Sequence, residues 1–218
     1  MITAHGGALG TIRNSKLYFA RADSYLCDTL EVDVRRKGGR LYLNHTPRFI
    51  TLMGTLSLAY AFDVVKDKDM LINCDLKSRG IAQAVESLAL EMGVADKLIF
   101  TGSITEKEAS ELTCGMAFFN SLDGISYSAG NAGEIKRRLD SYNSKVFAGI
   151  NVNKWLVTDE FIRECVAEGI KVSLFTINSR REALKYATMG LYNITTNIPD
   201  TVYSIVGNIS SGKATMNF

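Results

Sequence analysis

The sequence predicts a (β/α)8 barrel, and two patterns carry this prediction. Short apolar segments that fit β-strands alternate along the 218 residues with longer amphipathic segments that fit α-helices. Glycines follow several of the expected helices, where a left-handed residue often ends a helix; these are Gly93, Gly115, Gly169 and Gly190. Regular alternation implies parallel strands with right-handed crossovers. Eight such units favour closure into a barrel, although periodicity alone leaves an open doubly wound sheet as an alternative.

The first half of the chain contains three strand-and-helix units and one extra strand. The expected strands are 2–4, 29–34, 40–44 and 70–77, of which 40–44 is the short extra strand that leads to His45. The expected helices are 14–26, 49–62 and 81–91. In the last of these, apolar residues at 81, 85, 88 and 89 share one helical face.

The second half continues the same rhythm. The expected strands are 97–101, 116–122, 146–152, 171–177 and 191–196. The expected helices are 105–115, 134–142, 159–168, 179–190 and a last one that begins at Pro199, a residue favoured at the first helical position. Two of them begin with capping-box patterns, Thr105-x-x-Glu108 and Ser179-x-x-Glu182.

The composition is that of one ordinary globular domain. Hydrophobic residues make up 46% of the sequence and charged residues 22%. The chain has only two prolines and no serine- or glycine-rich linker, so we expect a single domain over residues 1–218. Its 25 basic and 23 acidic residues are interspersed and form no basic stripe, which argues against a nucleic-acid partner.

The cysteines and the apolar segments indicate the compartment. Four cysteines, at 27, 74, 114 and 165, are scattered without a Cys-x-x-Cys pair, which is typical of reduced thiols rather than of disulfides or a zinc site. No apolar run approaches the roughly 20 residues that cross a bilayer, and no leader-like pattern opens the sequence. We therefore expect a cytoplasmic protein without a transmembrane segment.

Acidic residues alternate with aliphatic ones in the second strand. Glu31 and Asp33 are two residues apart, so their side chains project from the same face of the strand. Asp75 and Lys77 repeat this spacing at the end of the third strand. Two buried carboxylates repel each other and lose hydration, and a hard cation such as Mg²⁺ or Ca²⁺ relieves both costs. The alternative is ordinary surface alternation, which the repeated acid–base pair makes less attractive.

The only two histidines lie at strand ends. His5 ends the first strand and is followed by Gly6-Gly7, where the backbone can approach an anion, and His45 ends the short extra strand. A lone histidine is more often structural than catalytic. Two imidazoles near a set of carboxylates fit the general acid and general base that phosphodiester cleavage requires.

Six segments in the same order resemble the motifs of one enzyme family. They are Ala4-His5-Gly6-Gly7, Glu31-Val32-Asp33-Val34, Asn44-His45, Asn73-Cys74-Asp75-Leu76-Lys77, Phe175-Thr176-Ile177-Asn178 and Thr196-Asn197-Ile198-Pro199-Asp200. The family is that of the glycerophosphodiester phosphodiesterases, and the resemblance covers nearly the whole chain. It implies a barrel of the phospholipase-C-like phosphodiesterase type.

The resemblance also implies roles for individual residues. Glu31, Asp33 and Asp75 would bind the divalent cation, and His5 and His45 would form the acid–base pair. Phosphate would lie against Lys77, Gly6 and Arg13. The implied reaction is hydrolysis of a glycerophosphodiester, or a related small phosphodiester, to an alcohol and a phosphomonoester. Such an enzyme would serve glycerol and lipid metabolism; a homo-oligomer is left open.

Four departures from the family pattern predict an altered substrate preference or reduced activity. Gly6 stands where the family has an arginine, Asp75 replaces a glutamate, Asn197 replaces an aspartate, and Arg13-Asn14-Ser15 replaces Glu-Asn-Thr. The family's insertion after the second histidine is also missing. A barrel that binds a phosphorylated ligand without efficient turnover is therefore an alternative function.

One further alternative depends on aromatic residues. A phospholipase-type or sphingomyelinase-type barrel would need a membrane-docking surface, and the sequence offers no evident cluster of exposed aromatic residues for one. Trp155 and Phe175 are candidates for the walls of the pocket instead.

Overall fold

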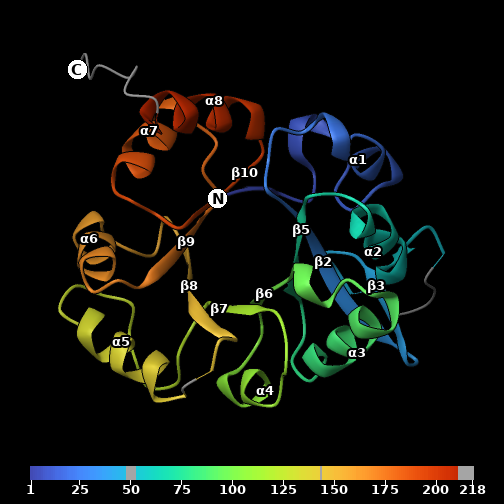
Figure 1. Cartoon of the computed structure of the whole chain (residues 1–218), viewed down its shortest axis with the longest axis horizontal. Coiled ribbons are helices and arrows are strands. Elements are labelled where there is room, and N and C mark those ends of the chain that lie inside the picture. The colour runs from blue at the N-terminus through green and yellow to red at the C-terminus, as the bar shows by residue number, and fades with distance from the viewer. Residues whose placement is uncertain (48–52, 143, 211–218) are drawn as a thin grey trace.

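The computed structural model describes residues 1–47, 53–142 and 144–210, and in them the chain forms a closed barrel of parallel strands (Figure 1). The barrel strands are β1 (Ile2–Ala4), β2 (Thr29–Lys37), β5 (Leu71–Leu76), β6 (Leu98–Gly102), β7 (Met116–Phe119), β8 (Phe147–Asn153), β9 (Lys171–Phe175) and β10 (Asn193–Thr196). Their order is β1-β10-β9-β8-β7-β6-β5-β2, and β1 pairs with β2 to close the ring. The predicted (β/α)8 barrel is confirmed, and the open sheet is excluded.

Helices surround the barrel on its outside, as Figure 1 shows. They are α1 (Lys16–Ala20), α2 (Leu58–Lys66), α3 (Ala82–Met92), α4 (Glu106–Ser110), α5 (Ala132–Ser141), α6 (Asp159–Ala167), α7 (Arg180–Thr188) and α8 (Pro199–Ser210). The capping box predicted at Thr105 forms, because its hydroxyl accepts from the Glu108 N–H while the Glu108 carboxylate accepts from the Thr105 N–H. Ser179 caps α7 by accepting from the Glu182 N–H, and its hydroxyl donates to the Glu182 carboxylate. None of the described helices is both long and apolar enough to cross a membrane.

The main apolar core lies between the strands and the helices. Phe62 on α2, Val85 on α3 and Phe161 on α6 are fully buried there against the barrel. Hydrogen bonds link a second, polar set of buried side chains across β1, β10, β9 and β8; they are Thr3, Asn193, Ser173 and Asn151, joined by bonds of 2.8–2.9 Å. Because His5 follows Thr3 on the same face of the chain, this polar set lies below the end of the barrel that carries the candidate site.

The segment after β3 (Arg40–Leu43) differs from the prediction. The expected helix 49–62 is right only from Leu58 onward, because a two-residue strand β4 (Leu56–Ser57) pairs antiparallel with β3 before α2 begins at Leu58. Gly54 has a φ of +79°, which a helix does not allow, and the Ser57 hydroxyl caps the helix by accepting from the Tyr60 N–H. Residues 49–52 of the predicted helix lie outside the described residues.

The first helix is also shorter than expected. Instead of a helix over 14–26, the chain forms one turn of α1 and then a separate 3-10 turn at Ala22–Ser24. Asn14 is left-handed, with a φ of +55°, so the helix begins only after Ser15, whose hydroxyl caps it. The helix after Thr105 ends at Ser110 rather than near residue 115. Strand β2 continues three residues beyond the predicted Val34 and turns into β3.

Candidate active site

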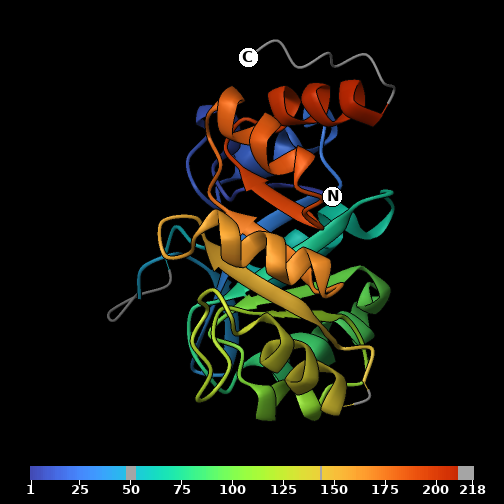
Figure 2. The same ribbon diagram turned by 90° about the vertical axis from the view of Figure 1, so that its left-hand side faces the viewer.

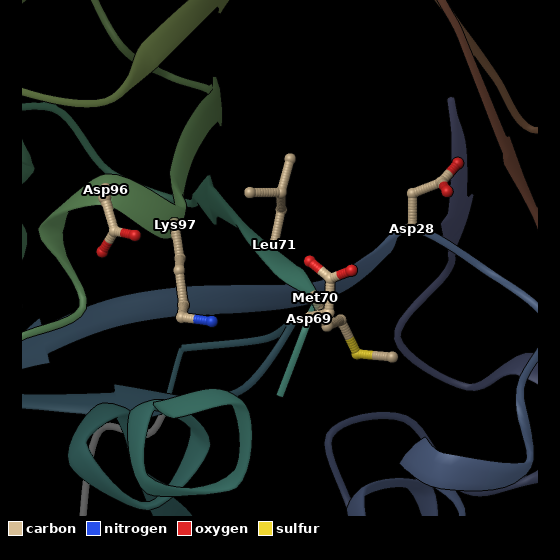
Figure 3. A pocket seen from close by; sticks show the side chains of 6 residues that line it. All are labelled: Asp28, Asp69, Met70, Leu71, Asp96 and Lys97. Atoms are coloured by element: carbon tan, nitrogen blue, oxygen red, sulfur yellow. The ribbon is translucent and has the colours of Figure 1, made fainter. Parts of the chain in front are cut away.

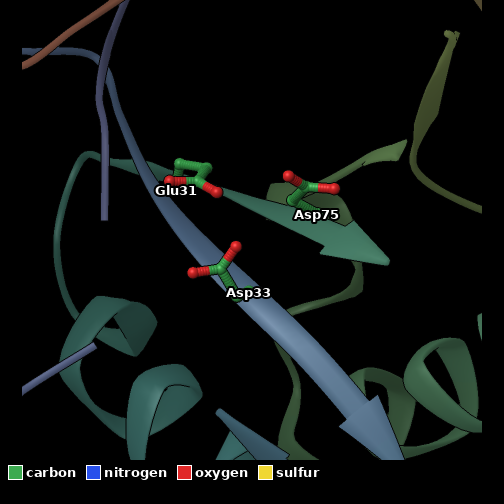
Figure 4. Close-up of side chains that lie close together, drawn as sticks. All are labelled: Glu31, Asp33 and Asp75. Atoms are coloured by element: carbon green, nitrogen blue, oxygen red, sulfur yellow. The ribbon is translucent and has the colours of Figure 1, made fainter. Parts of the chain in front are cut away.

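Three carboxylates meet where β2 and β5 approach the end of the barrel (Figure 4). Asp33 on β2 lies directly opposite Asp75 on the neighbouring β5, and Glu31 lies two residues earlier on β2. One oxygen from each of the three side chains lies within 4.8 Å of the other two. Glu31 and Asp33 are buried and Asp75 is half-buried. The structure therefore brings together all three residues that the alternation predicts as ligands.

The charges in this cluster are only partly balanced. Lys77 follows β5, and its ammonium group lies 2.9 Å from Asp33 Oδ1 and 2.5 Å from Asp75 Oδ2. Burial would raise the pKa of Asp33, but Lys77 and the Asn14 amide together hold it below its ordinary value. Burial, followed by repulsion from Asp33 and Asp75, raises the pKa of Glu31 to about 8. Burial also raises the pKa of Asp75, although Lys77 offsets part of the rise. Three ionised carboxylates here need more positive charge than Lys77 provides.

The donor set fits a hard divalent cation. Asp75 Oδ1 is buried and has no hydrogen-bond partner, which is costly for a carboxylate oxygen unless a cation meets it. The backbone of β6 makes room for this oxygen: a Cβ on Gly102, whose φ is +80°, would lie 2.0 Å from it. Carboxylate oxygens are the ligands that Mg²⁺ and Ca²⁺ prefer. Glu31, Asp33 and Asp75 together are thus suited to hold either ion.

One backbone N–H group and one side-chain amide orient the carboxylates. The Gly6 N–H donates to Glu31 Oε2 at 2.5 Å. The Asn14 amide donates to Asp33 Oδ2 at 2.7 Å and accepts from the Asp33 N–H at 3.1 Å. Sequence reasoning did not single out Asn14 or Gly102. Asn14 appeared only as the residue of Arg13-Asn14-Ser15 that matches the asparagine of the family's Glu-Asn-Thr, without a predicted role; an amide residue tolerates the left-handed backbone this position adopts.

His5 lies beside the cluster in a fixed orientation. Its Nδ1 is 3.0 Å from Asn197 Oδ1, and its Nε2 is 4.0 Å from Glu31 Oε2. Because an amide oxygen only accepts hydrogen bonds, Nδ1 carries the proton and the Nε2 lone pair faces the carboxylates. Burial, and then the nearby charge of Arg13, lowers the pKa of His5 to about 4. At neutral pH His5 is therefore an uncharged imidazole with a free acceptor.

His45 lies at the same end of the barrel but is exposed. Arg35 fixes its backbone, because the guanidinium donates to the His45 carbonyl at 2.7 and 3.1 Å and to the Lys77 carbonyl at 3.0 Å. Its position close to the cluster is thereby set through the main chain. The structure places His5 against the carboxylates and His45 at the rim.

Arg13 occupies the space beside Gly6. A Cβ on Gly6 would lie 3.5 Å from Arg13 Cγ and 3.0 Å from Glu31 Oε2. The Arg13 Nε lies 3.9 Å from Asp33 Oδ2, and its side chain is 40% exposed. Because Gly6 has no side chain, the side chain of Arg13 has room to approach the acidic cluster.

Two other features fall outside this site. A hollow of about 360 Å³ lies at the opposite end of the barrel, where strands begin, and is lined by Asp28, Asp69, Met70, Leu71, Asp96 and Lys97 (Figure 3). Asp28 there accepts from the Ile2 N–H at 2.7 Å, and Lys97 donates to the Lys68 carbonyl, so both bind structural partners. Trp155 is 79% exposed and therefore does not wall a closed pocket, contrary to that prediction.

Solved structures share the fold of this chain, whereas no protein-family model and no curated protein matches its sequence. A putative glycerophosphoryl diester phosphodiesterase from Agrobacterium tumefaciens has a TM-score of 0.76 at 13% identity, over 96% of this chain and 98% of that one. A glycerophosphodiester phosphodiesterase from Parabacteroides distasonis has a TM-score of 0.76 at 16% identity, over 96% and 97%. A phosphodiesterase from Oleispira antarctica, in complex with the product sn-glycerol-3-phosphate, has a TM-score of 0.73 at 18% identity, over 95% and 96%. The chain thus has the (β/α)8 fold of these phosphodiesterases along nearly its whole length.

Proposed function

We propose that the protein is a metal-dependent phosphodiesterase that hydrolyses a glycerophosphodiester, or a related small phosphodiester, to an alcohol and a phosphomonoester. The observation that carries the proposal is the pairing of a three-carboxylate cluster, with one buried and unpartnered oxygen, and an uncharged histidine. Both lie at the end of the barrel where barrel enzymes build their active sites. The shared fold of solved phosphodiesterases supports the same reading.

In this proposal the carboxylates hold the cation, and the cation and the basic residues hold the phosphate. Glu31, Asp33 and Asp75 bind Mg²⁺ or Ca²⁺, which would supply positive charge to the nonbridging phosphate oxygens. Lys77 and Arg13 add charge from the protein, and Arg13 takes the place of an arginine at position 6. A guanidinium binds phosphate through two parallel N–H groups, so its relocation preserves a strong contact.

The histidines divide the proton transfers. His5 Nε2 accepts the proton of the attacking hydroxyl while the hydroxyl oxygen bonds to phosphorus. His45 donates a proton to the leaving alcohol while the bond between phosphorus and the alcohol oxygen breaks. If the attacking group is the glycerol 2-hydroxyl, the product is a cyclic phosphate that water then opens. An intramolecular nucleophile gains from proximity.

A second function is favoured by the surroundings of His5. Its partner is the neutral Asn197 rather than a carboxylate, and a pKa of about 4 makes His5 a weak base at neutral pH. A barrel that binds a phosphorylated ligand without efficient turnover fits this observation. The two functions differ in whether product is released.

Hydrolysis of a panel of glycerophosphodiesters with Mg²⁺ or Ca²⁺ tests the proposal. We expect phosphomonoester release that falls about 10²–10⁴-fold in His5→Ala, because general base catalysis is lost. In Arg13→Ala we expect kcat/KM to fall about 10–100-fold, the effect of losing a charged hydrogen bond. Arg163→Ala, which removes an exposed arginine on the outer helix α6, is the matched control and should keep the parent rate. Ligand binding without turnover of any diester would favour the second function.

A further inference from the structure

Three of the four most exposed large hydrophobic side chains among the described residues lie on loops at one end of the barrel. Among the described residues, four large hydrophobic side chains are more than three-quarters exposed: Ile12 at 77%, Met53 at 83%, Trp155 at 79% and Leu156 at 79%. All four lie on loops rather than on helices. Exposed hydrophobics on the outer helices, such as Leu90 on α3, are covered to a greater extent, with exposures between 37% and 55%. Single exposed apolar residues are ordinary on a protein surface. Here, however, the most exposed ones are all on loops and most of the less exposed ones are on the outer helices, which calls for an explanation.

Three of these residues surround the mouth that holds the carboxylate cluster. Ile12 lies between β1 and α1, and Trp155 and Leu156 directly follow β8. The carboxyl ends of parallel barrel strands meet at one end, so both loops rise from the end that carries Asp33 and Asp75. In Figure 2 this is the left-hand end of the barrel, where the orange loop after β8 extends outward.

Basic groups accompany the apolar residues. Lys154 Nζ lies 4.4 Å from the centroid of the Trp155 ring, a cation–π contact, but it also pairs with the Glu182 carboxylate at 2.6 Å, so its charge is already compensated. Arg180 and Arg181 are exposed at the start of α7, directly after β9, which is the neighbour of β8 in the barrel. Arg13 is exposed next to Ile12. The exposed positive charge near the apolar side chains therefore comes from arginines, Arg13 beside Ile12 and Arg180 and Arg181 at the start of α7.

This combination matches a phospholipid surface. Indole rings settle at the level of the headgroups, aliphatic side chains enter the acyl boundary, and arginine and lysine meet the lipid phosphates. The arginines complement an anionic headgroup layer. The apolar side chains of Ile12 and Leu156 gain nothing from contact with water, and the acyl boundary of a lipid layer would cover them.

We propose that the mouth of the barrel docks on a phospholipid surface through Trp155, Leu156 and Ile12, which we call the docking residues, with Arg180 and Arg181 facing the headgroups. Docking brings the carboxylate cluster to the headgroup layer, so a phosphodiester could reach it without leaving the lipid. This last consequence rests on the proposed function, but docking itself does not.

Trp155 is the only tryptophan in the chain, so its fluorescence reports on docking without a label. The full chain is titrated with vesicles of phosphatidylcholine and with vesicles that also contain phosphatidylglycerol. We expect the emission maximum to shift to shorter wavelength, brominated acyl chains to quench it, and the protein to sediment with the anionic vesicles at least tenfold more tightly than with the zwitterionic ones.

Two substitutions of exposed leucines form a matched pair. Leu156→Asp should weaken vesicle binding at least tenfold, while Leu90→Asp, on the outer helix α3, should leave it unchanged. Thermal unfolding of each variant checks that the fold is retained. Ile12→Asp gives an independent second variant in the other loop and should weaken binding as Leu156→Asp does.

Three results would overturn the docking proposal. They are an emission spectrum unmoved by either vesicle, equal losses in Leu156→Asp and Leu90→Asp, and a blue shift that follows protein concentration without vesicles, which would mean that a second copy covers the surface. Hydrolysis of a water-soluble diester is measured on the same samples. Docking that fails while hydrolysis persists contradicts this inference alone, and the reverse contradicts the proposed function alone.

Discussion

The environment of His5 depends on one amide group. Asn197 Oδ1 accepts from Nδ1 at 3.0 Å and so keeps the ring in one tautomer. Burial and then the Arg13 charge lower the pKa of His5 to about 4, although Asp33 and the hydrogen bond to Asn197 offset part of the change. The tautomer of His5 is thus set by a residue nearly two hundred positions away in the sequence, while burial dominates its basicity.

Replacing this amide with a carboxylate should raise the pKa of His5. In Asn197→Asp the added negative charge stabilises the imidazolium, so the pKa should move upward from about 4 toward the ordinary 6.5. The chain has only two histidines, so the ring protons of His5 can be followed by nuclear magnetic resonance, with His45 as the reference signal. An unchanged His5 titration would show that Asn197 does not govern the ring.

The raised pKa of Glu31 predicts a pH-dependent stability without cation. The folded state keeps the Glu31 proton up to about pH 8, whereas the unfolded chain releases it near 4.5. The folded state thus binds more protons in this window, and its free energy of unfolding falls as pH rises, by at most about 1.4 kcal/mol per pH unit. The lowered pKa of His5 acts in the opposite direction below 6.5, and the lowered pKa of the partly buried Met1 amino group does so below 8.0, so the informative quantity is the part of the slope between pH 6.5 and 8 that depends on Glu31.

Urea unfolding across this interval measures the effect. Glu31→Gln should remove this part of the slope, and saturating Mg²⁺ or Ca²⁺ should flatten it in the parent by compensating the carboxylates. Asp63→Asn, which changes an exposed acid on α2, should keep it. Equal slopes in the parent and in Glu31→Gln would contradict the assignment of Glu31.

At the scale of residues, the sequence predicts the ligands better than their supports. Glu31, Asp33 and Asp75 follow from strand alternation, because a period of two places side chains on one face. The role of Gly102 does not follow, and Asn14 was visible only as a match to the family's asparagine, since both roles arise from contacts between segments far apart in the chain. The side chain of Arg13 beside Gly6 is likewise a tertiary contact that spacing alone does not reveal.

Strand elements in this barrel are held close by glycine as well as by hydrogen bonds. Gly149 on β8 lies opposite Lys171 on β9, and a Cβ there would be 2.0 Å from the Lys171 carbonyl oxygen. Gly133 on α5 has no such neighbour, because the nearest atom to a Cβ would be Arg137 Nη1 at 3.9 Å. A side chain thus has no room at Gly149 in the strand, whereas it has room at Gly133 in the helix.

Alanine at these two positions should have opposite effects. Gly149→Ala forces β8 away from β9 and should lower the free energy of unfolding by about 1–3 kcal/mol. Gly133→Ala should raise it by about 0.5–1 kcal/mol, because alanine favours the helix. Urea denaturation of both variants measures the difference. Similar stabilities in the two would contradict the close approach of the strands.

The elements predicted from periodicity were mostly right where capping signals were present. The Thr105 and Ser179 helices begin as their side chains indicated. Residues 53–57 were wrongly assigned to the helix that begins at Leu58, because apolar content does not distinguish a short edge strand and turn from a helix. Gly54 was the signal against a continuous helix.

At the scale of the molecule, the barrel itself was predictable, but its closure was inferred from the number of units. The pairing that closes it joins β1 to β2, with Thr3 opposite Thr29. The gathering of Ile12, Trp155 and Leu156 at the mouth could not be seen in the sequence, because they come from loops more than a hundred residues apart. Closure converts scattered loop residues into one surface.

The most direct measurement of the central proposal is phosphorus nuclear magnetic resonance of a glycerophosphodiester incubated with chelator-treated protein, before and after cation is added. The account predicts conversion of the diester signal to a phosphomonoester only after Mg²⁺ or Ca²⁺ is restored. Losing a hydrogen-bond partner of a metal ligand costs up to roughly 100-fold in rate. Asp33→Asn removes a ligand itself, so the rate should fall by more than this, while Asp63→Asn should match the parent. Conversion that is equally fast without cation, or no conversion with either ion, would contradict it.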